Sequence, residues 1–151
     1  MSGYGARPMP GRMLGLDLGE RRIGVAISDE MGLIASPLTM VPRQGPVVKD
    51  VRELIDRYGI VRLVVGMPVG LSGREGPQAI ATRTYAESIR GEFGVPLDYW
   101  DERMTSSIAE QHLIASGVRR GKRKQQVDAV AAAVMLQGYL DNQRFRGERG
   151  R

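Results

Sequence analysis

The hydrophobic pattern divides most of the chain into strands and helices. Residues 13–19 and 22–29 alternate between apolar and other positions around a short turn, so they predict an antiparallel pair of strands. A third strand is expected over 33–41. The nearly unbroken apolar run over 60–67 is typical of a strand buried on both faces, and 95–100 predicts the last strand.

Helical spacing fills the segments between and after the later strands. Apolar residues after position 46 recur at intervals of four, three and four, and Gly59 ends this helix. Further helices are expected up to about Phe93, over 105–116 and over about 125–142. The order predicts an α/β fold with a mixed β-sheet, three antiparallel strands and then parallel strands, with helices on both faces.

The chain length of 151 residues is that of one domain. Residues 1–12 are rich in glycine and proline and contain no hydrophobic signal segment, so they predict a disordered leader. The folded domain is expected over 13–142. Residues 143–151 form a basic segment that predicts a flexible tail.

The composition excludes several classes of protein. The chain has no cysteine, which rules out disulfides and thiolate chemistry and suits a cytoplasmic location. No apolar run approaches the roughly 18 residues of a membrane span, so a membrane partner is not expected. His112 is the only histidine, which argues against a catalytic triad or a histidine-rich metal site.

Basic residues are concentrated in two segments. The net charge is +5, and the tail carries four arginines against one glutamate. Such clusters attract polyanions, although they also occur as solvated loops. The other cluster lies in a stretch interpreted as a loop before the last helix and supplies candidate nucleic-acid-binding residues: Arg119, Arg120, Lys122, Arg123 and Lys124.

Three acidic residues stand out by their context. Asp17 interrupts the first apolar strand, where an unpaired charge costs several kcal/mol. Glu102 follows the last strand, and Asp128 lies among the small apolar residues of the final helix. Each has an ordinary alternative. Asp17 could pair with Arg21, Glu102 could be a surface acid, and Asp128 could favour the helix dipole.

Considered together, the three carboxylates suggest metal chemistry. Hard oxygen ligands from different elements are what Mg²⁺ or Mn²⁺ requires. Two such ions roughly 4 Å apart can stabilise the attacking and leaving oxygens of phosphodiester hydrolysis, and neighbouring basic residues such as Arg21 would hold the phosphates. The residues by themselves leave open whether the acids converge and whether one or two ions bind.

The segments around these acids resemble the YqgF (RuvX) family of Holliday junction resolvase-like nucleases, which have a ribonuclease H-like fold. The resemblance covers about residues 13–142, in four segments: Asp17–Gly19 with Arg21–Ala26, Val65–Gly73, Asp101–Ser106 and Val127–Ala132. It implies a catalytic, metal-binding site of Asp17, Glu102 and Asp128, with Arg103 facing the substrate phosphates.

The resemblance also implies the substrate. It points to 5′-end processing of precursor 16S rRNA in ribosome biogenesis, and alternatively to cleavage of four-way DNA junctions in recombination and repair. The chain departs from the family pattern at Gly70 and Ser72, where asparagine and aspartate are usual, so loop contacts to substrate are in doubt. Gln126 replaces a frequent lysine, and Lys124 could substitute for it.

Two other hypotheses remain. The strand-turn motif around Asp17 also resembles the first phosphate loop of actin-like ATPases and sugar kinases, but those enzymes need two such domains and this chain has length for one. A non-catalytic RNA-binding module would explain the basic residues, yet aromatic residues for base stacking make up only 5%. The expected partner is nucleic acid, and formation of a homodimer is left open.

Overall fold

The computed structural model describes residues 11–68, 76–102 and 120–149, with the side chains of the last range described for 127–145. The helix predicted over 105–116 lies outside these residues. The described elements, in chain order, are β1 (Arg12–Leu18), β2 (Arg22–Ser28), β3 (Ala35–Pro42), α1 (Val47–Tyr58), β4 (Ile60–Met67), α2 (Pro77–Ile89), the 3₁₀ helix η1 (Arg90–Glu92), β5 (Leu97–Asp101) and α4 (Arg120–Arg149).

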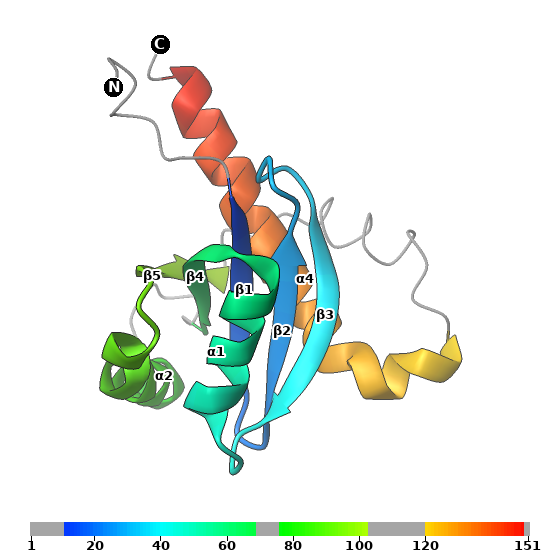
Figure 1. Ribbon diagram of the computed structural model, residues 1–151, viewed down its shortest axis with the longest axis vertical. Coiled ribbons are helices and arrows are strands. Elements are labelled where there is room, and N and C mark those ends of the chain that lie inside the picture. The colour runs from blue at the N-terminus through cyan, green and yellow to red at the C-terminus, as the bar shows by residue number, and fades with distance from the viewer. Residues whose placement is uncertain (1–10, 69–75, 103–119, 150–151) are drawn as a thin grey trace.

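The strands form one five-stranded sheet in the order β3-β2-β1-β4-β5. β1 pairs antiparallel with β2, and β2 with β3, whereas β4 is parallel to both β1 and β5. Figure 1 shows α1 crossing one face of this sheet, while α4 crosses the other. The predicted mixed α/β sheet with helices on both faces is confirmed.

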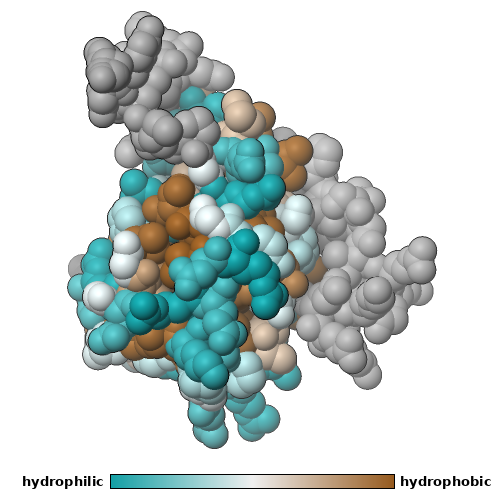
Figure 2. Space-filling view, in the orientation of Figure 1, coloured by the Kyte–Doolittle hydropathy of each residue, from teal (hydrophilic) through white to brown (hydrophobic). Residues whose placement is uncertain are grey.

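One face of the sheet packs against α1 and α2. Because side chains alternate along a strand, every second residue of β1, β2 and β4 reaches this core. Members of the core include Leu14, Leu16, Ile23, Val25 and Leu63, all buried. Polar residues cover the outer surface of α1 in the space-filling view, with hydrophobic residues visible beside it (Figure 2).

The opposite face of the sheet is built for close approach of α4. Gly15 lies on this face, and a Cβ atom there would stand 2.9 Å from Leu136 Cβ. A Cβ atom on Gly66 would stand 2.8 Å from Met135 Cγ. The helix contributes Ala132 among its fully buried residues. Small residues on both partners therefore let the helix axis lie near the strands.

Helix α1 agrees with its sequence signals. Val47, Val51 and Ile55 are its buried residues, so the apolar stripe at helical spacing does face the sheet. Gly59 adopts the left-handed conformation with φ 64°, and its N–H bonds the carbonyl of Ile55. A residue with a Cβ atom is strained at this φ, which is why glycine ends the helix.

Helix α4 is longer than predicted at both ends. It begins at Arg120, so the basic stretch interpreted as a loop is helical from that residue on. It continues to Arg149, through most of the segment predicted as a flexible tail. Arginine, lysine and glutamine are good helix formers, and they outweigh the cost of Gly121 in the helix. None of the helices in the described ranges is long and apolar enough to cross a membrane.

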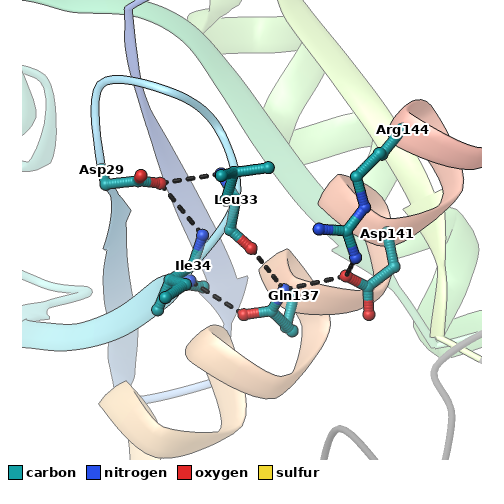
Figure 3. A network of polar contacts seen from close by, with 7 residues as sticks. Asp29, Leu33, Ile34, Gln137, Asp141 and Arg144 are labelled. Atoms are coloured by element: carbon teal, nitrogen blue, oxygen red, sulfur yellow. Dashed lines mark hydrogen bonds and ion pairs between the residues drawn. The ribbon is translucent and has the colours of Figure 1, made fainter. Parts of the chain in front are cut away.

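A side chain of α4 also fixes the turn between β2 and β3. Gln137 donates from Nε2 to the Leu33 carbonyl at 2.9 Å and accepts from the Ala35 N–H at 2.9 Å (Figure 3). The Asp29 carboxylate accepts from the N–H groups of Leu33 and Ile34 at 2.7 and 3.0 Å. The side chains of Gln137 and Asp29 therefore bond the backbone N–H and carbonyl groups of this turn.

Candidate catalytic site

The alternation of β1 directs Asp17 to the α4 face of the sheet. Gly15, two positions earlier, contacts α4, and Asp17 follows on the same side. Asp17 lies one residue before the end of β1 and pairs across the strands with Gly24 of β2. The carboxylate is half-buried, so it loses part of its hydration without leaving the reach of solvent.

Helix α4 brings Asp128 to the same place by packing on Gly24. A Cβ atom on Gly24 would lie 1.8 Å from the Asp128 carbonyl oxygen and 2.3 Å from its carbonyl carbon. Only glycine leaves room for the helix backbone here. Burial raises the pKa of Asp17, and the negative charge of Asp128 raises it further. The predicted neighbours Asp17 and Asp128 therefore do come together.

Glu102 reaches the site from the other side of β1. It follows directly on β5, whose Trp100 pairs with Gly66 of β4. A Cβ atom on Gly66 would lie 2.8 Å from Glu102 Oε1, so this glycine makes room for the carboxylate. Burial raises the pKa of Glu102 to about 7, with further contributions from the charges of Asp17 and Asp101.

Asp17 thus lies between Asp128 and Glu102 and interacts with both charges. The charge of Asp128 raises the pKa of Asp17, and the charge of Asp17 raises the pKa of Glu102. Among residues 11–68, 76–102 and 120–149, however, no group of three Asp, Glu, His or Cys side chains is close enough to hold a single metal ion. The three-ligand set remains a prediction.

An arginine that the sequence reasoning passed over contacts the site directly. Arg22 Nε donates to Asp128 Oδ2 at 2.8 Å. The proposed pairing of Asp17 with Arg21 does not occur among the described ion pairs. The missed signal lies in the strand pattern, because Arg22 is two residues before Gly24 and so lies on the same face of β2. A contact between residues 106 apart cannot be read from the spacing alone.

Arg43 fixes the turn that connects β1 and β2. Its Nη1 donates to the Gly19 carbonyl at 2.8 Å, and its guanidinium lies 3.8 Å from the ring centroid of Tyr85. The backbone N–H of Arg43 also donates to the Arg21 carbonyl at 2.9 Å. Arg21 itself is exposed in this turn. Arg21, which is predicted to bind substrate, therefore lies in a turn in which Arg43 bonds two carbonyl groups.

The other predicted basic contacts can be placed only in part. Arg103 and Arg119 lie outside the described residues. Arg120, Lys122, Arg123 and Lys124 belong to the first two turns of α4, and their side chains are also outside the described part. Asp128 is therefore the ninth residue of the helix rather than a residue of its first turn. The helix dipole, which acts within the first turn, does not explain this acid.

The chemistry of the acidic residues fits a divalent cation. Carboxylates are the hard oxygen donors that Mg²⁺ and Mn²⁺ prefer. Burial and neighbouring negative charge disfavour the charged forms of Asp17 and Glu102. A cation among these groups would reverse the repulsion and favour all three ionised carboxylates. The types of donor atom are therefore those of a magnesium or manganese site.

The strand order, the helices on both faces and the acids near the ends of β1 and β5 define an α/β protein of ribonuclease H-like fold. The solved complex of Thermus thermophilus RuvC with a Holliday junction substrate shares this fold, with a TM-score of 0.55 and 15% identity over 87% of this chain and 96% of that one. The family model described as "RuvX: Holliday junction resolvase" matches residues 11–142. The chain therefore belongs to the RuvX family.

Relatives of similar length support the same assignment. A protein of Geobacillus kaustophilus is 45% identical over 137 residues, which cover 88% of this chain and 99% of the relative. One from Symbiobacterium thermophilum is 46% identical over 132 residues, covering 86% and 92%. Both carry the name "Putative pre-16S rRNA nuclease". The family resemblance stated from the sequence motifs is confirmed.

Proposed function

We propose that this protein is a divalent-metal-dependent nuclease that hydrolyses phosphodiester bonds in structured nucleic acid, and that it processes the 5′ end of precursor 16S rRNA. The observation that carries the proposal is the placement of Asp17 between Asp128 and Glu102 on the α4 face of the sheet. Three acids from three elements, with Asp17 near the charges of the other two, have no stabilising role that explains them together.

Asp17, Glu102 and Asp128 would hold Mg²⁺ or Mn²⁺. When bound, such an ion lowers the pKa of a water molecule and offsets negative charge on the leaving oxygen. The basic side chains have a separate task, which is to bind and orient the phosphate groups. The exposed position of Arg21 in the turn bonded by Arg43 supports this role for it. Arg103 and the basic start of α4 are assigned the same role from the sequence.

The choice of RNA rests on the names of the relatives, which refer to 16S rRNA. The alternative is cleavage of four-way DNA junctions, which is favoured by the family description and by the RuvC complex of the same fold. The protein would act in the cytoplasm, where both substrates occur in a bacterial cell.

A direct comparison of substrates tests the proposal. Purified protein is incubated with a precursor 16S rRNA fragment and with a four-way DNA junction, each with Mg²⁺, with Mn²⁺ and with a chelator. We expect cleavage of the RNA near the mature 5′ end in either metal and none with chelator. Cleavage of the junction alone would replace RNA by DNA as the substrate. Tight binding without cleavage of either substrate would instead indicate a non-catalytic binding module.

A further inference from the structure

Arg22 stands out among the described basic residues because it is bonded to one of the predicted metal ligands. Its Nε lies 2.8 Å from Asp128 Oδ2, while its side chain is 56% exposed and that of Asp128 is 33% exposed. A guanidinium has five N–H groups, and only Nε–H is bonded within the described part of the chain. The remaining donors have no partner among those residues, and more than half of the side chain is exposed to solvent.

This ion pair is not required to position α4. The helix backbone at Asp128 already rests on Gly24, and the next residue, Ala129, is buried. Ion pairs between solvent-exposed side chains contribute little to folding, because they gain little from attraction in water. A well-packed helix would remain in place without Arg22, so the pair needs another explanation.

The pair has a chemical consequence for the site. Arg22 neutralises Asp128 while Asp17 and Glu102, the other two acids, have no ion pair among the described residues. The guanidinium bonds Asp128 Oδ2, so a divalent cation that takes this oxygen as a ligand has to compete with Arg22 for it. Once released, the planar guanidinium is suited to phosphate, which it binds through two parallel N–H bonds. Its partly exposed stem leaves it free to move.

We propose that Arg22 is a metal-responsive positioning residue: it holds Asp128 in the metal-free protein, yields that carboxylate to the bound cation, and then binds a phosphate of the nucleic acid. The inference rests on the proposed metal-dependent function. It adds an ordered exchange in which loading of the cation creates a phosphate-binding group. Arg22 thereby couples occupancy of the metal site to affinity for substrate.

The first test is Mn²⁺ affinity in the absence of nucleic acid, measured by electron paramagnetic resonance on the full chain. Arg22→Gln removes the competitor and should tighten Mn²⁺ binding about two- to fivefold, the range expected for an exposed ion pair. Arg22→Lys keeps the charge and should lie between. Arg21→Gln is the matched control for loss of one positive charge nearby and should have a clearly smaller effect.

The second test is RNA binding at several salt concentrations, with chelator and with Ca²⁺, which takes the same kind of oxygen ligands. With Ca²⁺, Arg22→Gln should weaken binding and reduce the slope of log K against log salt by about 0.7 to 0.9, one phosphate contact. With chelator, the slopes of wild type and variant should agree, because Asp128 holds the arginine.

Several results would overturn the exchange. They are unchanged or weaker Mn²⁺ binding by Arg22→Gln, equal effects of the Arg21 and Arg22 variants on Mn²⁺ affinity, and a slope change for Arg22→Gln that does not depend on Ca²⁺. These outcomes are separable from failure of the proposed function. A wild-type protein that cleaves RNA while Arg22→Gln behaves like the control refutes only the exchange. A wild-type protein that binds no Mn²⁺ refutes both.

Discussion

Replacement of Gly24 by alanine puts a methyl group at the point where α4 crosses β2. The new carbon would lie 1.8 Å from the Asp128 carbonyl oxygen. Non-bonded contacts between carbon and oxygen are at least about 3.3 Å, so the helix or the strand has to move by roughly 1.5 Å. The obstructing atoms belong to the backbone and cannot rotate away. We expect a loss of about 3 kcal/mol in the free energy of unfolding, at the upper end for overpacking.

Chemical denaturation followed by circular dichroism measures this loss, and thermal unfolding should show a midpoint about 6–12 °C lower. The matched control is Gly91→Ala, because a Cβ atom on Gly91 meets nothing within 4 Å. Its effect should stay within about 0.5 kcal/mol. Gly24→Ala should also weaken Mn²⁺ binding by moving Asp128 from Asp17. Equal stability of the two variants would refute the close packing that places Asp128.

Two further predictions concern stability. Burial and neighbouring charge raise the pKa of Glu102 to about 7 from its usual 4.5, so the metal-free protein should lose stability as the pH rises from about 4.5 through 7. Glu102→Gln should flatten this part of the curve of unfolding free energy against pH in denaturation experiments. An unchanged curve would contradict the raised pKa of Glu102. Gln137→Ala removes the bonds to Leu33 and Ala35, so urea denaturation should show a loss of about 1–2 kcal/mol, with Mn²⁺ affinity unchanged. A loss of metal binding in that variant would mean that the β2–β3 turn supports the site.

Periodicity was enough to predict the sheet and helix α1. Apolar residues alternate along the strands because one face of the sheet packs on α1 and α2, where residues such as Leu14, Leu16 and Val25 are buried. Gly59 ends α1 through a local requirement for positive φ. Such features depend on neighbouring residues in the chain, so they can be read without knowing the fold.

The predictions that failed or were missed depend on distant partners. Gly24 appears in the sequence as part of a strand, and its role emerges only when α4 lies across it. The pairing of Arg22 with Asp128 likewise needs β2 and α4 side by side. Local signals also conflict at the start of α4, where Gly121 disfavours a helix and the surrounding arginines and lysines favour one. Asp17 itself could be chosen in advance because a charge in an apolar strand is costly wherever it folds, and the family resemblance then added Glu102 and Asp128 to the same site.

The central claim, that Asp17 belongs to a metal-dependent nuclease centre, is tested most directly by cleavage of precursor 16S rRNA with Mg²⁺. The comparison is between wild type, Asp17→Asn and Asp56→Asn, since Asp56 is an exposed acid on α1 outside the site. Loss of a carboxylate that binds the catalytic ion should reduce the single-turnover rate at least a hundredfold, with folding and RNA binding retained. Asp56→Asn should cleave at the wild-type rate. Cleavage by Asp17→Asn at that same rate would contradict the account.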